Sequence, residues 1–120
     1  MSQVLKPQMI EGISEVDCQQ VFAQIADLPG KVKLIDVRRP DEFTAELGHI
    51  DGAQLIPLGP DLVQYLETEN KDQEIVFVCR SGGRSGSATF ESARLGFKKS
   101  MNLAGGMLAW NALKLPTVKA

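Results

Sequence analysis

The chain has 120 residues, 43% of them hydrophobic, with 13 basic and 15 acidic side chains and a formal net charge of −2. This composition is typical of one globular domain and excludes disordered and fibrous classes. A small net charge gives no general attraction for nucleic acid or an anionic membrane, so we expect neither as a partner and expect any anion binding to be local.

The cysteine count and the lack of a long apolar run bear on the cellular compartment of the protein. No run approaches the length that spans a bilayer, and the first residues lack the apolar core of a signal peptide. The two cysteines, Cys18 and Cys79, lie 61 positions apart and do not form a disulfide framework. Because a thiol used for chemistry must stay free, we expect a reducing compartment and a cytoplasmic protein.

Hydrophobic patterning predicts strands and helices in alternation. Residues 1–8 are expected to be a loose arm, and 114–120 a short tail. Ser14 is predicted to cap a helix that extends to Leu28 and ends at Pro29-Gly30. Strands are predicted at 32–37, 54–56, 74–78 and 100–103, and further helices after Pro40, after Pro60, at 85–95 and at 107–113.

Strands that alternate with helices over short connections indicate an α/β fold. The strand candidates are nearly continuous apolar runs, as in parallel sheets buried on both faces. We therefore expect a single domain over 1–120, with a central, mainly parallel sheet of about five strands and helices on both faces. Ligands of such sheets bind beyond the carboxyl ends of the strands, which directs attention to the residues after 74–78.

A short loop with a thiol follows that strand. Two glycines allow the backbone to curl, so that its amides face inward and form a site for an anion at a helix start. The loop consists of Cys79, Arg80, Ser81, Gly82, Gly83, Arg84 and Ser85. Its two arginines are expected to add positive charge around the sulfur.

This setting predicts that Cys79 is a nucleophilic thiolate. Helix starts and cationic neighbours lower a cysteine pKa from its usual value of about 8.5 to roughly 3.5–7.5. The alternative is a small buried hydrophobic residue, which is common for free cysteine. The loop lacks the Lys-Ser/Thr and the G-x-G-x-x-G spacing of nucleotide-binding loops.

With these residues in view, the chain resembles the rhodanese family over about residues 9–113. The motifs that carry the resemblance are Leu34-Ile35-Asp36-Val37-Arg38 with Pro40, Glu42 and Phe43; Gly48-His49-Ile50 with Gly52-Ala53 and Ile56-Pro57; Val78 to Ser85; and Gly96-Phe97 with Asn102-Leu103-Ala104-Gly105-Gly106 and Ala109-Trp110. They occur in the family's order and together are highly specific.

The resemblance implies a sulfurtransferase that works through a persulfide on Cys79. The implied donor is thiosulfate or a persulfide, the acceptor is cyanide, a thiol or a protein, and no metal or organic cofactor is implied. Covalent catalysis of this kind divides one hard step into two easier ones. A sulfur-relay module that does not turn over by itself is an alternative.

A second alternative, a cysteine-loop phosphatase or arsenate reductase, is disfavoured by loop length. Those enzymes carry C-x5-R, whereas Cys79 to Arg84 is C-x4-R. One residue fewer removes up to about 3.5 Å of chain, so the ring suits a sulfur atom better than a tetrahedral oxyanion.

Three further positions complete the analysis. Asp36 and Arg38, at the end of the 32–37 strand, are expected either to brace the loop or to form a simple ion pair. Cys18 falls on the apolar face of the first helix and is expected in the core, with a resolving role against Cys79 as the alternative. Between Phe43 and Gly48 the chain has four residues, 44–47, where the family usually has two, and we expect this segment at the pocket mouth.

Overall fold

The computed structural model describes residues 4–119 and is built on a six-stranded, mostly parallel sheet. The strand order is β1-β2-β6-β5-β3-β4, and only β1 and β2 pair antiparallel among the strands described. The strands are β1 (Gln8–Ile10), β2 (Ile13–Val16), β3 (Val32–Asp36), β4 (Gln54–Leu55), β5 (Glu74–Val78) and β6 (Ser100–Leu103).

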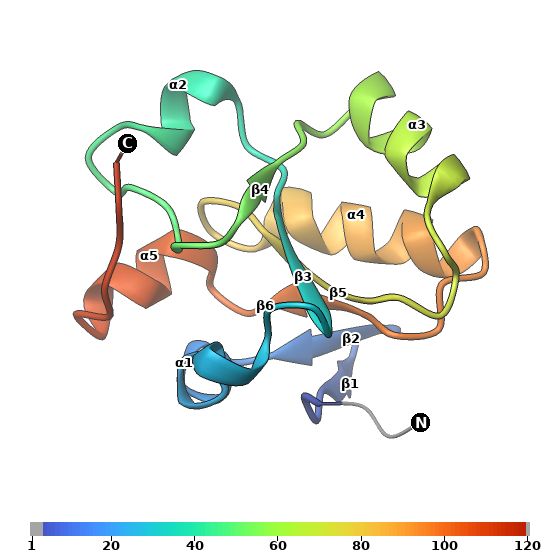
Figure 1. Cartoon of the computed structure of the whole chain (residues 1–120), viewed down its shortest axis with the longest axis horizontal. Coiled ribbons are helices and arrows are strands. Elements are labelled where there is room, and N and C mark those ends of the chain that lie inside the picture. Colours follow the sequence, from blue (N-terminus) through green and yellow to red (C-terminus); the bar gives the residue numbers. More distant parts are fainter. Residues whose placement is uncertain (1–3, 120) are drawn as a thin grey trace.

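Helices cover both faces of the sheet, with α3 and α4 over one face and α1 beyond the other (Figure 1). The helical segments are α1 (Cys18–Ala23), the 3-10 turn η1 (Ile25–Asp27), α2 (Pro40–Phe43), α3 (Pro60–Thr68), α4 (Gly83–Arg94) and α5 (Gly106–Ala112). The predicted α/β fold is therefore confirmed. None of the helices within residues 4–119 is long and apolar enough to cross a membrane.

Alternating residues of β5 fill two separate cores. Val76 and Val78 pack in one cluster with Trp110 of α5. Ile75 and Phe77 point to the other face and pack in a second cluster with Leu66 of α3. Because side chains alternate along a strand, a central strand between two helical layers needs apolar residues on both faces, which explains the unbroken apolar run from Ile75 to Val78 in β5.

The prediction of a loose arm over residues 1–8 is wrong for residues 4–8. Leu5 is fully buried, and the carboxylate of Glu74 accepts hydrogen bonds from the amides of Val4 and Leu5, each at 3.0 Å. Gln8 then begins β1, which pairs with β2 in a hairpin. Neither strand was predicted from the sequence. β1 has only three residues, which is too short for the alternating pattern that predicts a strand. Residues 1–3 lie outside the described part.

The first helix also differs from the prediction. Ser14 lies in β2 opposite Met9 and is not a cap. The cap is Asp17, whose carboxylate accepts a hydrogen bond from the backbone amide of Gln20 at 2.7 Å. Aspartate and serine are about equally favourable at the N-cap of a helix. The helix ends at Ala23 and tightens into η1 instead of continuing to Leu28.

The last described residues pack back onto the domain. Val118 and His49 exchange backbone hydrogen bonds of 2.8 and 2.9 Å, and Trp110 donates its indole N–H to the carbonyl of Pro116 at 2.8 Å. The C-terminal segment consequently runs beside the chain that follows α2 (Figure 1). Residue 120 of the predicted tail lies outside the described residues.

Replacement of Glu74 by alanine is expected to lower the free energy of unfolding by about 2–3 kcal/mol, because two amides lose a charged acceptor in a buried place. Urea denaturation measures the loss. Glu67→Ala, on the exposed face of α3, is the matched control and should stay within about 0.5 kcal/mol. Equal effects of the two substitutions would contradict the role given to Glu74.

Candidate active site

The predicted loop lies at the carboxyl end of the central strand. Cys79 follows β5 directly, and α4 begins at Gly83, two residues earlier than predicted. The chain turns at Gly82, which caps α4 with φ 105°, a left-handed conformation that side chains other than glycine rarely adopt. Because β3, β5 and β6 are parallel, their carboxyl ends also meet at this edge.

Donor groups of the loop surround the sulfur of Cys79. The amide of Gly82 lies 3.1 Å from Sγ, and the hydroxyl oxygen of Ser85 lies 3.2 Å from it. The other side of the residue belongs to the apolar cluster beneath α3 and α4, and only 1% of Cys79 is exposed. The sulfur is therefore buried, with apolar packing on one side and hydrogen-bond donors on the other.

These donors decide the ionisation of Cys79. Burial by itself raises the pKa of the thiol, because a charge is poorly solvated there. Hydrogen bonds from the Ser85 hydroxyl and from the amides of Ser85, Gly82 and Ser81 outweigh burial, so the pKa of Cys79 lies below its ordinary value. Hydrogen bonds to an anion are stronger than neutral ones, so they favour the thiolate.

Cys18 shows the opposite behaviour. It is 2% exposed and packs in the core cluster on the other face of the sheet, as the sequence predicted. Burial and the negative charge of Asp17 raise the pKa of Cys18 to about 11. Cys18 therefore stays a protonated thiol, while Cys79 is disposed to ionise.

The hydroxyl of Ser85 has one proton and two acceptors. It lies in hydrogen-bond contact with Sγ of Cys79 and with Oδ1 of Asn102. The amide nitrogen of Asn102 donates to the carboxylate of Glu15 at 2.7 Å and to the carbonyl of Gly82 at 3.2 Å, which fixes Oδ1 toward Ser85. The single Ser85 proton can therefore bond either the sulfur or Asn102, and the bond to the sulfur is the one that favours the thiolate.

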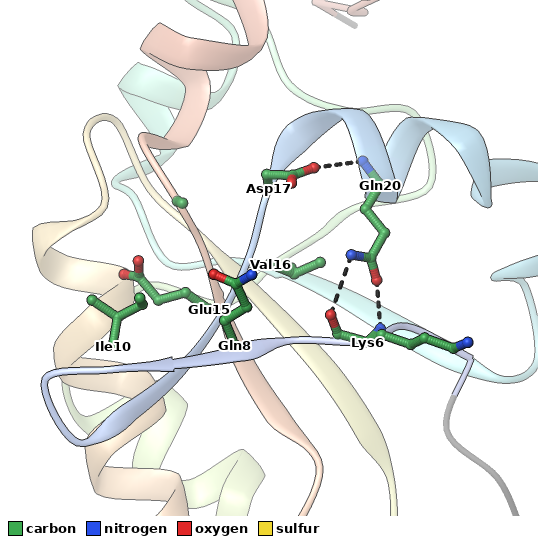
Figure 2. A pocket seen from close by; sticks show the side chains of 8 residues that line it. Lys6, Gln8, Ile10, Glu15, Val16, Asp17 and Gln20 are labelled. Carbon is green, nitrogen blue, oxygen red and sulfur yellow. Dashed lines mark hydrogen bonds between the residues drawn. The ribbon is translucent and has the colours of Figure 1, made fainter.

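Asn102 and Glu15 were not among the predicted site residues. Asn102 stood in a quoted motif, but nothing in the sequence marked Glu15. Its side chain also lines a cavity of about 180 Å³ between the β1–β2 hairpin and α1. Figure 2 shows this cavity, which the Gln20 side chain limits on one side through its hydrogen bonds to the backbone of Lys6.

The start of α5 holds the backbone of the loop. The amides of Met107 and Leu108 donate to the carbonyls of Cys79 and Arg80, each at 2.9 Å. Gly106 has φ 58°, and a Cβ there would lie 2.5 Å from the carbonyl oxygen of Cys79. Only glycine allows this close approach at position 106, and at Gly105, with φ 76°, a Cβ would lie 2.6 Å from that of Ala109.

The two arginines, which were expected to add positive charge around the sulfur, lie in different surroundings. Arg80 is exposed, as are Ser81 and Gly83. The guanidinium of Arg84 forms two hydrogen bonds, 2.7 and 2.8 Å long, with the carboxylate of Glu42 in α2. The positive charge of Arg84 is therefore largely offset by a neighbour.

Asp36 and Arg38 form a fully buried ion pair at 2.8 Å. Arg38 also donates to the carbonyls of Glu42 at 3.3 Å and Gly48 at 2.8 Å. These bonds brace the segment that carries Glu42, whose side chain binds Arg84. The Asp36–Arg38 pair is thus connected to the active-site loop through the bonds of Glu42 to Arg38 and Arg84.

Within residues 4–119, no group of three or more His, Cys, Asp or Glu side chains is arranged to hold a metal ion. Both cysteines are free thiols. The chemistry that the described residues themselves offer is that of a buried sulfur nucleophile in a ring of donors.

The chain is similar to a known domain family and to proteins named as sulfurtransferases. The sequence model of the Rhodanese-like domain matches residues 21–113. A sulfurtransferase of Allochromatium vinosum is 33% identical over 106 residues, which cover 88% of this chain and 95% of that protein. The putative sulfurtransferase YtwF of Bacillus subtilis is 46% identical over 83 residues, 69% of this chain and 77% of that protein.

A solved structure extends the likeness to three dimensions. The human single-domain sulfurtransferase TSTD1 superposes with a TM-score of 0.71 at 28% sequence identity. The match covers 82% of this chain and 95% of that chain. The two proteins therefore share the fold over most of their lengths.

Replacement of Ser85 by alanine is expected to raise the pKa of Cys79, since the thiolate loses a donor. A higher pKa moves the curve of alkylation rate against pH toward higher pH, so iodoacetamide should react several-fold more slowly near neutral pH. Ser87→Ala, at an exposed position of the same helix, should leave the curve unchanged. An unshifted curve for Ser85→Ala would contradict the assignment of Ser85 as a donor.

Replacement of Gly106 by alanine is expected to lower the free energy of unfolding by about 2–4 kcal/mol, because the new Cβ meets the Cys79 carbonyl at a positive φ. Urea denaturation measures the loss. At Gly83 a Cβ meets nothing within 4 Å, so Gly83→Ala should be neutral or slightly stabilising. Similar stabilities of the two variants would show that the α5 contact is not tight.

Proposed function

This chain belongs to the rhodanese family, and we propose that it transfers a sulfane sulfur from thiosulfate or a persulfide donor to a thiophilic acceptor through a persulfide on Cys79. The acceptor is cyanide in an assay and a thiol or a protein in the cell. The observation that carries the proposal is the ring of donors that lowers the pKa of a buried thiol. Family membership and the named sulfurtransferases among its relatives support it.

In the first step, the thiolate of Cys79 attacks the outer sulfur of thiosulfate. A new S–S bond forms, the S–S bond of the donor breaks, and sulfite leaves with the bonding electron pair. The products are a negatively charged cysteine persulfide and sulfite, so charge and atoms balance. We expect the amides of Ser81, Gly82 and Ser85, which bond Sγ of Cys79 in the resting protein, to stabilise the negative charge of the persulfide as well.

In the second step, the acceptor attacks the terminal sulfur of the persulfide. With cyanide, a C–S bond forms, the S–S bond breaks, thiocyanate leaves, and Cys79 returns as a thiolate. The donors that favour the thiolate at the start of the cycle also favour it as the leaving group here, because a thiol of lower pKa leaves faster. The same side chain therefore serves both halves of the reaction.

The short C-x4-R loop supports sulfur transfer over phosphoryl or arsenate chemistry. The amide of Gly82 and the hydroxyl of Ser85 already lie within 3.2 Å of Sγ. A thiol that must remain free for this cycle suits a reducing compartment such as the cytoplasm.

Replacement of Cys79 by serine is expected to reduce thiosulfate:cyanide sulfur transfer by about a thousandfold or more, because the nucleophile is lost. Thiosulfate-treated wild-type protein should gain the mass of one sulfur atom and lose it again on addition of cyanide. Intact-mass measurement and a thiocyanate assay check the two expectations.

The matched control is Cys18→Ala, which should still take up one sulfur atom. Sulfur on Cys18, or full activity of Cys79→Ser, would contradict the proposal. Persulfide formation with little turnover would support a sulfur-relay role for Cys79, and hydrolysis of a phosphate ester would point to phosphatase chemistry instead.

A further inference from the structure

The ion pair between Glu42 and Arg84 joins α2 to the active-site loop. Both terminal nitrogens of Arg84 bind the carboxylate, at 2.7 and 2.8 Å. The pair is partly shielded, with the side chain of Glu42 16% exposed and that of Arg84 34% exposed. By contrast, Arg39 and Asp41 on the same helical turn are 66% and 70% exposed, which makes their pair a weak surface contact.

Glu42 is held in place from several sides. Its carboxylate also accepts the backbone amide of Arg39 at 3.1 Å, and its backbone carbonyl accepts the guanidinium of buried Arg38 at 3.3 Å. Because these bonds already fix the carboxylate, its contact with Arg84 costs little additional conformational entropy. The ion pair is therefore a stable part of the active-site loop's surroundings.

Glu42 occupies the end-on pair of N–H groups with which a guanidinium binds an oxyanion. A guanidinium recognises oxyanions through two parallel N–H groups, and the two bonds to Glu42 have this form. Arg84 lies close enough to Cys79 for their charges to interact. A donor at Cys79 therefore meets a neutralised cation, or must displace the carboxylate to reach it.

The competition does not weaken at working pH. Hydrogen bonds from Arg84, together with the Arg39 amide and against the effect of burial, lower the pKa of Glu42 to about 2. A group with a pKa this low stays ionised throughout the neutral range, so protonation does not release Arg84. Only substitution of Glu42 changes the charge that the donor meets.

We propose that Glu42 is a specificity-determining residue, because its carboxylate occupies Arg84 and so disfavours donors of high negative charge relative to donors that carry a single charge. This proposal rests on the function proposed above. The favoured substrates are monoanionic sulfane donors such as thiosulfonates. The ratio of KM for the thiosulfate dianion to KM for such a donor is higher with the Glu42 carboxylate than without it.

The test is Glu42→Gln, which keeps the length of the side chain and an acceptor for the Arg39 amide while it removes the charge. The KM for thiosulfate should fall about three- to tenfold, with kcat within about twofold, because a freed cation improves binding of the dianion. The KM for methanethiosulfonate, which carries one charge, should fall by a clearly smaller factor. Steady-state assays at saturating cyanide give both values.

Two controls separate charge from structure. Asp41→Asn removes a neighbouring negative charge that does not bind Arg84, and it should leave the ratio of the two KM values unchanged. In an Arg84→Gln background, Glu42→Gln should have no effect on that ratio, since the cation it frees is gone. Glu42→Met, neutral and of similar length, serves as the second variant if the glutamine protein does not fold.

An unchanged KM ratio in Glu42→Gln and Glu42→Met would overturn the proposal, as would a loss of kcat with both donors, which would mark Glu42 as a purely structural link. Failure of the proposed function looks different: wild-type protein would take up no sulfur from either donor. The two failures are thus distinguished by the wild-type intact-mass measurement.

Discussion

The site depends on the balance between burial of one sulfur atom and the hydrogen bonds that reach it. Cys79 is almost fully buried against an apolar cluster, which by itself would keep the thiol protonated. Four donors, namely the hydroxyl of Ser85 and the amides of Ser81, Gly82 and Ser85, reverse that tendency. A sulfur charged in this way is poorly solvated by water, so the proposed attack on a donor would not require the removal of a hydration shell.

The scaffold fixes those donors from three directions. β5 delivers Cys79 to the edge of the sheet, Gly82 turns the chain into α4, and α5 binds the carbonyls of Cys79 and Arg80. Gly106 permits that contact because it has no side chain. Cys18 is equally buried but has no such ring, and burial together with the negative charge of Asp17 raises its pKa to about 11. Environment, rather than residue type, therefore separates the two cysteines.

Local patterns in the sequence predicted the central elements and the loop. The apolar run of β5 and the glycines that follow Cys79 depend on backbone preferences, which neighbouring residues reveal. The β1–β2 hairpin was missed because its strands are short. Bonds between Arg84 and Glu42, 42 residues apart, and between Asn102 and Glu15, 87 apart, arise only when the chain has folded. Such polar pairs leave no periodic signal in the sequence, so the charge environment of the site could not be predicted from it.

The most direct test of this account is the titration of both cysteines in one protein. Peptide-resolved alkylation of the wild-type chain across a range of pH gives a separate curve for each thiol. The expected result is that Cys79 reacts as a thiolate at lower pH than an ordinary cysteine, while Cys18 stays unreactive until far more alkaline pH. Coincident curves, or a curve for Cys79 above that of an ordinary thiol, would show that burial prevails over the ring of donors.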